Sequence, residues 1–102
     1  MAPRNVNRRP FREELPRLLK ARGESLRSIA GALGGIDHAY LSRMVSGKAA
    51  VNPQHAKRIA VHLGLPANYF PEVREAAVVD AIRRNANLRD SIYFKQIRGS
   101  RW

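Results

Sequence analysis

The chain has 102 residues, enough for one domain, and its 44% share of hydrophobic residues is typical of a folded globular protein. Nineteen Lys and Arg against eight Asp and Glu give a net charge of +11, which favours a polyanionic partner, with nucleic acid first and an anionic membrane surface second. The absence of cysteine excludes disulfides and thiolate zinc sites, and the lack of any run of about 18 apolar residues predicts a cytoplasmic protein without a membrane span.

The N-terminal segment, residues 1–11, predicts a flexible basic arm. It contains two prolines and no acidic residue. Such arms follow phosphates or the minor groove in other DNA-binding modules, and the arginines of this segment are candidates for those contacts. They are Arg4, Arg8 and Arg9. The alternative is a disordered tail that only keeps the protein in solution.

Two short helices joined by glycines are predicted after a first helix over residues 13–22. Leucines at helical spacing indicate that first helix, and Gly23 ends it. Ser25 is a suitable N-terminal cap for the second helix, which ends at Gly34 and Gly35. The apolar stripe of the second helix consists of Ile29, Ala30 and Leu33.

The third predicted helix, residues 37–45, separates its side chains into two faces. At about 100° per residue, its small, polar and cationic residues fall within an arc of roughly 140°. They are His38, Ala39, Ser42, Arg43 and Ser46. The other side carries Tyr40, Leu41, Met44 and Val45. Such a helix can pack its apolar side on a partner helix and present its polar side to another molecule, for which the net charge favours DNA.

Three further helices complete an all-α prediction. Asn52 followed by Pro53 is typical of a capped helix start, and an apolar stripe extends this fourth helix to Leu63. A fifth helix follows over residues 72–84, and a last one begins after Asn85. No stretch alternates with a period of two, so no sheet is expected. We expect a compact bundle of four to five helices with one or two extra C-terminal helices.

The C-terminal helices carry more apolar side chains than a small extension needs to cover itself. They are Val78, Val79, Ile82, Ile92, Tyr93 and Phe94. A homodimer through these helices is one interpretation, and simple packing against the domain is the other.

The order of caps, glycines and apolar positions over residues 12–70 resembles the helix-turn-helix domain of the Xre family, of the Cro and phage-repressor type. The resemblance rests on Leu15, Gly23, Glu24, Ser25, Ile29, Ala30, Leu33, Gly34, Ile36, Leu41, Ser42, Arg43, Met44, Gly47, Lys48, Ala56, Ile59, Ala60, Leu63 and Gly64. Two features differ from the family pattern. Leu26 stands where many relatives have glutamine, and the turn at Gly34 and Gly35 is one residue longer than the commonest form.

The resemblance implies a bundle of the lambda-repressor-like type, with the second helix across the DNA backbone and the third in the major groove of double-stranded DNA. It implies a sequence-specific transcriptional regulator, a repressor of phage or bacterial origin, and members of this class usually bind as dimers. The chain then divides into an arm (1–11), a DNA-binding domain (12–70), a C-terminal helical extension (71–97) and a tail (98–102).

By position, the resemblance implies base contacts from the outer side of the third helix. The positions that match are His38, Ala39 and Arg43, and Ser42 is a fourth candidate because its side chain is short enough to allow close approach. Arg43 is the strongest, because a guanidinium reaches O6 and N7 of guanine together, and its alternative role is that of a solvated surface arginine. His38 is either a donor to a base or phosphate or merely a cap. Ala39 offers only a methyl group, which suits thymine.

Phosphate contacts are expected near the start of the second helix and around the end of the third. Free N–H groups and the helix dipole attract phosphate at a helix N-terminus, and cationic side chains attract it elsewhere. The candidates are Ser25, Arg27, Ser28, Tyr40, Ser46 and Lys48. For Tyr40 the alternative is packing at the edge of the core.

No catalytic constellation is visible, so we expect no enzyme, no cofactor, no metal and no small-molecule ligand. His55 and His62 lie two helical turns apart, about 10 Å, which is too far to share a metal ion. Two other functions remain open. One is an antitoxin or accessory protein that regulates its own operon and holds a partner protein through the C-terminal helices. The other is a coating protein that binds DNA without sequence preference.

Overall fold

The computed structural model describes residues 6–98, and all regular structure within this range is helical. The elements are α1 (Phe11–Arg22), α2 (Leu26–Leu33), α3 (His38–Ser46), α4 (Pro53–His62), α5 (Pro71–Arg84), α6 (Ala86–Ile92) and η1 (Tyr93–Arg98), a π-helical continuation of α6. The all-α prediction is confirmed. Arg4 and residues 99–102 of the predicted tail lie outside the described residues.

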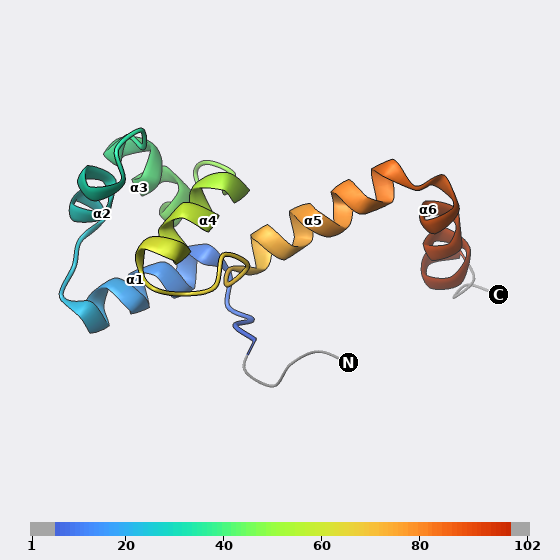
Figure 1. The fold of residues 1–102 in the computed structure, drawn as a ribbon, viewed down its shortest axis with the longest axis horizontal. Coiled ribbons are helices and arrows are strands. Elements are labelled where there is room, and N and C mark those ends of the chain that lie inside the picture. Colours follow the sequence, from blue (N-terminus) through green and yellow to red (C-terminus); the bar gives the residue numbers. More distant parts are fainter. Residues whose placement is uncertain (1–5, 99–102) are drawn as a thin grey trace.

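Helices α1 to α4 form a compact group, and α5 projects from it and carries α6 at its far end (Figure 1). Within residues 6–98, no helix is long and apolar enough to cross a lipid bilayer.

The core lies between α1, α2, α3 and α4 and includes the start of α5. Its buried hydrophobic side chains are Phe11, Leu15, Leu19, Ile29, Ala30, Ile36, Leu41, Met44, Ala56, Ile59, Ala60, Leu63, Phe70 and Val73. The apolar stripe predicted for the fourth helix is buried along its whole length. In the stripe predicted for the second helix, Ile29 and Ala30 are buried and Leu33 is half-buried. The rings of Phe11 and Phe70 meet edge to face with their centroids 4.9 Å apart, which joins the start of α1 to the connector before α5.

The segment before α1 is tied to the domain. The Phe11 N–H donates to both carboxylate oxygens of Glu72, at 3.0 and 3.2 Å. The Asn7 side chain donates to the Tyr69 carbonyl at 3.4 Å, and the Arg74 guanidinium donates to the Asn7 carbonyl at 2.6 Å. Helix α1 begins at Phe11, two residues earlier than predicted, and the described residues that lead into it are hydrogen-bonded to the domain.

Only the beginning of α5 packs into the core. Val73 is 4% exposed, whereas Val78 and Val79 are 56% and 39% exposed. Val78 is therefore largely exposed, whereas Val79 lines a shallow pocket together with Val51 and Pro53 of the domain. The packed domain extends past residue 70 to Val73.

Candidate nucleic-acid interface

The inner side of α3 packs against α1 and α2. Leu41 and Met44 are buried, and Tyr40 and Val45 are half-buried against the same core. The Tyr40 ring also meets the ring of His55 in α4 edge to face, with centroids 5.7 Å apart. This placement favours packing over a phosphate contact for Tyr40.

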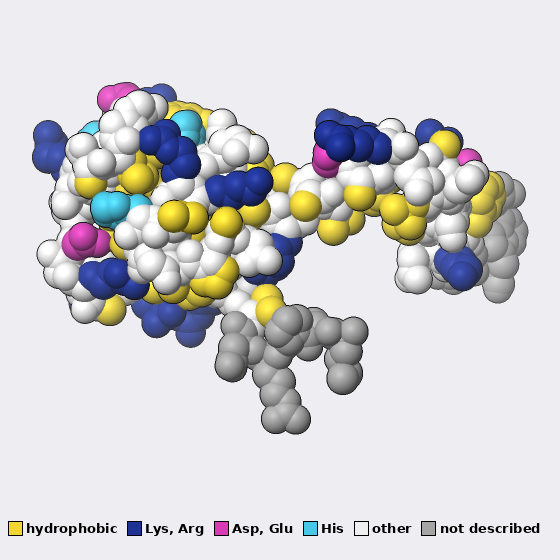
Figure 2. All heavy atoms as spheres, in the orientation of Figure 1, with side chains coloured by type: hydrophobic (Ala, Val, Ile, Leu, Met, Phe, Trp, Pro, Cys, Tyr) yellow, Lys and Arg dark blue, Asp and Glu magenta, His cyan; other side chains and the backbone are white. Residues whose placement is uncertain are grey.

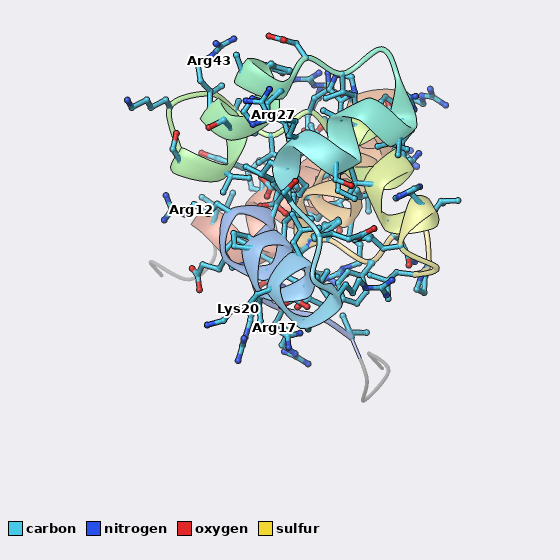
Figure 3. All side chains as sticks on the ribbon, turned by 90° about the vertical axis from the view of Figure 1, so that its left-hand side faces the viewer. Arg12, Arg17, Lys20, Arg27 and Arg43 are labelled. Carbon is cyan, nitrogen blue, oxygen red and sulfur yellow. The ribbon has the colours of Figure 1, made fainter. Side chains whose placement is uncertain are left out.

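The outer side of α3 holds the four residues that the sequence predicts as base readers. Ala39 and Arg43 are exposed, and His38 and Ser42 are half-buried. Figure 3 shows Arg43 pointing away from α3 on the same side of the domain as Arg27 of α2. A helix that buries one side and keeps small side chains on the other can approach a flat or grooved partner closely.

Arg43 carries an available positive charge. Its guanidinium carbon lies 5.8 Å from the centroid of the Tyr40 ring, a cation–π contact that restrains the side chain without neutralising it. Among residues 6–98, the ion pairs join Arg17 to Glu14, Arg84 to Asp80 and Arg89 to Asp90, and none involves Arg43. The guanidinium can therefore donate to a ligand.

The turn between α2 and α3 contains two glycines with positive φ angles, 63° at Gly34 and 68° at Gly35. Other residues rarely adopt this backbone conformation, so the longer turn depends on glycine at both positions. The Arg58 guanidinium in α4 donates to the carbonyls of Leu33 and Gly34, at 2.8 and 3.1 Å. Arg58 of α4 thus holds the end of α2 in place. Arg58 is 25 residues from Leu33 and 24 residues from Gly34 along the chain, and no local sequence signal predicts these contacts.

The start of α2 has the geometry expected of a capped helix. The Ser25 hydroxyl oxygen accepts a hydrogen bond from the Ser28 N–H at 3.1 Å, which confirms Ser25 as the cap. Arg27 and Ser28 are exposed beside it. The hydroxyl proton of Ser25 and the positive end of the helix dipole remain available to an anion.

The end of α3 combines a tight backbone turn with two cationic side chains. Gly47 has a φ of 84°, and the N–H groups of Lys48 and Ala49 both donate to the Arg43 carbonyl. Lys48 is exposed. A Cβ placed on Gly47 would lie 3.3 Å from Nη1 of Arg12, so the first turn of α1 brings a second cation to this end of α3.

Arg12 is a site residue that the sequence reasoning did not single out. In the sequence it is only the last of a run of N-terminal arginines, and its closeness to Gly47 depends on how α1 packs against α3. The hydroxyl of Ser46, another residue that the sequence predicts to bind phosphate, donates to the Arg43 carbonyl at 3.2 Å.

The structure does not bring Arg8 and Arg9 to the outer side of α3. Both side chains are exposed next to the anchored Asn7, whose side chain accepts from the Arg9 N–H at 3.1 Å. Figures 1 and 3 show this segment leaving α1 on the side away from α2 and α3. The described residues of this segment therefore give no support to the predicted contacts of the arm with DNA.

Within the described range, no group of three or more His, Asp or Glu side chains is arranged to hold a metal ion. His55 contacts Tyr40 through its ring, and His62 is exposed near the end of α4.

Comparison with known proteins gives one match. Residues 17–70, just over half of the chain, match the protein-family model described as Helix-turn-helix. No curated protein and no solved structure matches the chain. The matched range begins within α1 and ends at Phe70, so it contains α2, α3 and α4 in full.

Proposed function

Because the chain belongs to the helix-turn-helix family of the Xre and Cro type, whose members are DNA-binding regulators, we propose that it is a transcriptional repressor that reads the major groove of double-stranded DNA with α3. The observation that carries this proposal is the outer side of α3, where an arginine without an acidic partner among the described residues stands between small side chains. A cationic, low-profile surface of this kind suits a negatively charged groove.

Arg43 is the principal base reader in this proposal. Its two terminal N–H groups suit O6 and N7 of guanine, a pairing that discriminates against the wrong base by about 1–3 kcal/mol. Ala39 contributes a methyl group and Ser42 a hydroxyl that is short enough for close approach. His38, at the start of α3, donates from its ring to a base edge or a phosphate.

Phosphate groups of the DNA backbone bind at the two ends of the α2–α3 pair. Ser25, Arg27 and Ser28 hold one phosphate at the start of α2, where the helix dipole adds to the attraction. Lys48 and Arg12 hold another beyond the end of α3. These contacts set the orientation of α3 and carry no sequence information.

The proposal is tested by in vitro selection of bound DNA with the wild-type chain, Arg43→Ala and Lys48→Ala. Arg43→Ala is expected to lose the preference for one guanine, at a cost of about 1–3 kcal/mol for that site. Lys48→Ala is expected to weaken all sequences alike and to reduce the salt slope of binding by about one unit. The control is Lys57→Ala, which removes one exposed charge from α4.

Two results would overturn this assignment. If Arg43→Ala and Lys48→Ala weaken all sequences equally, Arg43 does not read a base. If random DNA competes as well as selected DNA at about 0.15 M salt, the chain coats DNA without sequence preference.

A second candidate function is that of an antitoxin or accessory protein, which represses its own operon and holds a partner protein through α5 and α6. The exposed apolar side chains of these helices support it. A toxin-like reading frame beside the gene, and a stable complex of its product with this chain, would favour this candidate over a phage repressor.

A further inference from the structure

A groove lies between the first turns of α5 and the connector that joins α3 to α4. Its volume is about 230 Å³, room for one large side chain, since a water molecule takes about 30 Å³. It is lined by Val51, Pro53, Glu72, Glu75, Ala76 and Val79. Most of the lining is thus aliphatic, both charged residues are glutamates, and no described Lys or Arg lines the groove.

The charge of this groove is opposite in sign to that of the whole chain. Nineteen Lys and Arg outnumber eight Asp and Glu, yet two of those eight acidic residues lie together here. Figure 2 shows Lys and Arg side chains spread over the domain, and hydrophobic side chains along the start of α5. The acidic groove is therefore a local exception on a basic molecule, and it attracts a cation.

The charge of Glu75 has no use within the described fold. Glu72 lies in the first turn of α5, where the helix dipole favours a carboxylate, and its two oxygens accept from the Phe11 N–H. Glu75 lies one turn further along, where that effect has faded, and it forms no ion pair among residues 6–98. One turn beyond Glu75 are Val78 and Val79, which carry no charge.

The two carboxylates can act together on one cation. Residues three apart lie on the same side of a helix, with Cβ atoms about 5–6 Å from each other. A guanidinium suits such a pair, because its N–H donors form a planar fork that binds carboxylates at two points. It also relieves the repulsion between Glu72 and Glu75, which is greatest when no cation lies between them.

The aliphatic part of the groove fits the rest of an arginine side chain. Arginine packs its methylene stem on apolar surface while its charged end reaches polar groups. Val51 and Pro53 of the domain and Val79 of α5 provide that surface. A guanidinium is also more weakly hydrated than an ammonium group, so arginine loses less than lysine on entering such a groove.

The size of the groove indicates how the arginine arrives. Pockets for free small molecules usually measure about 300–1,000 Å³, and this groove is smaller. A hollow that accepts one side chain suits a single anchor within a larger protein contact, and arginine is among the residues that most often serve as anchors. A protein partner therefore fits the groove better than a free ligand does.

We propose that this groove binds an arginine side chain that a basic segment of a partner protein presents. The guanidinium donates to Glu75 and Glu72, and the stem packs on Val51, Pro53 and Val79. DNA does not suit the groove, because both of its charges are negative. The groove shares no residue with the outer side of α3, so this proposal goes beyond the reading of DNA and does not depend on it.

NMR of the isotope-labelled full chain tests the site, with N-acetyl-arginine amide as the probe. At about 0.15 M salt, charges more than about 8 Å away are screened, so the distant cations of the domain interfere little. The amide signals of Val51, Glu75, Ala76 and Val79 are expected to shift together and to saturate, with a dissociation constant of about 10 mM. N-acetyl-leucine amide, which lacks the charge, is expected to bind at least about fivefold more weakly.

Glu75→Gln tests the carboxylate, because it removes the charge and keeps the size of the side chain. It is expected to weaken the probe at least about fivefold. Glu13→Gln is the matched control, since it removes the charge of an exposed glutamate on α1, and it is expected to bind like the wild type. The NMR spectrum of each variant without the probe shows whether its fold is intact.

Val79→Ser tests the apolar part of the groove. It shortens the wall on which the arginine stem packs and is expected to weaken the probe about threefold. Val78→Ser is its matched control, because Val78 is the neighbouring valine, is 56% exposed and does not line the groove. This control is expected to leave binding unchanged.

Selection from a random peptide library on the immobilised full chain tests whether a protein segment is the occupant. Peptides that carry an arginine beside apolar residues are expected to be enriched, to bind at least about tenfold more tightly than the amino-acid probe, and to lose that gain on Glu75→Gln. Agmatine, a free guanidinium compound, is the comparison. If agmatine binds as tightly as the best peptide, the groove takes a free cation and the protein partner is overturned.

Three further results would overturn the proposal. The first is the absence of saturable shifts at these four residues with about 50 mM probe. The second is equal binding of the arginine and leucine probes, or equal losses in Glu75→Gln and Glu13→Gln. The third is enrichment of peptides that lack arginine. None of these results bears on Arg43, whose role is measured by DNA selection.

Discussion

Glu14 is the one charged side chain that is wholly buried among the described residues. Its carboxylate accepts from Nε and Nη2 of Arg17, at 2.8 and 2.7 Å, and from the hydroxyl of Tyr69. The hydrogen bonds from Arg17 hold the pKa of Glu14 below its usual value of 4.5, against the opposing effect of burial. Burial, followed by the bond to Glu14, raises the pKa of Tyr69.

We expect Glu14→Gln to destabilise the fold at pH 7 by about 1–3 kcal/mol, because an amide cannot accept all the hydrogen bonds of the carboxylate. A carboxyl whose pKa is lowered by folding contributes stability above its unfolded pKa and loses it as the pH falls through the folded value. The difference in unfolding free energy between wild type and variant should therefore shrink below about pH 4.5.

Chemical denaturation at a series of pH values measures this difference. Glu13→Gln serves as the control, since Glu13 is exposed on the same turn and has no side-chain hydrogen bond among the described contacts. A constant difference between wild type and Glu14→Gln from pH 7 to pH 3 would contradict the role given to the carboxylate.

The orientation of α3 relative to α2 depends on a third helix, α4. The two glycines of the turn permit several backbone paths, and the Arg58 bonds to Leu33 and Gly34 select one of them. Arg58 does not contact the outer side of α3 through any described hydrogen bond. It is a positioning residue for the proposed base readers.

We expect Arg58→Ala to lower the unfolding free energy by about 1 kcal/mol and to reduce discrimination between selected and random DNA up to about tenfold, because α3 then samples several orientations. Denaturation and competition binding measure the two effects. Lys57→Ala removes the same charge from the neighbouring position of α4 and should leave discrimination unchanged. Equal losses for the two variants would mean that Arg58 acts only through its charge.

The chain consists of a packed domain and a projecting C-terminal helical extension, and the boundary between these two parts falls inside α5. The family match ends at Phe70, but Val73 is buried, Glu72 binds the start of α1, and Arg74 binds the segment before it. The first turn of α5 is thus part of the domain, and only the rest of the helix is an extension.

Truncation separates these two parts. A chain that ends after Phe70 is expected to lose about 2 kcal/mol or more of stability, since burial of a valine alone contributes about 1.5–3 kcal/mol. A chain that ends after Asp80 keeps all these contacts and should unfold like the full-length monomer. Thermal and denaturant unfolding compare the three chains, and equal stability of the two truncated forms would contradict this boundary.

Most of the secondary structure and the inner and outer sides of α3 were predictable from the sequence, because their signals are local. Each of these signals involves residues that are close together in the sequence. They are the caps, such as Ser25 and Asn52, the glycines at helix ends and the apolar residues at helical spacing. The helical period alone separates Leu41 and Met44 from Arg43. The resemblance to the helix-turn-helix family rests on the same caps, glycines and apolar positions, and the family match over residues 17–70 confirms this resemblance.

The tertiary structure decided the contacts between distant segments. Tyr69 meets Glu14 across 55 residues, Glu72 meets Phe11 across 61, and Arg12 reaches Gly47 through the packing of α1 on α3. Whether the valines of α5 cover the domain or leave it was likewise undecided by their spacing, since one apolar stripe suits either arrangement. The sequence alone shows which side of each helix is apolar. Which neighbouring helix that side contacts is known only from the folded chain, because the contact depends on how all the helices bury their apolar sides at the same time.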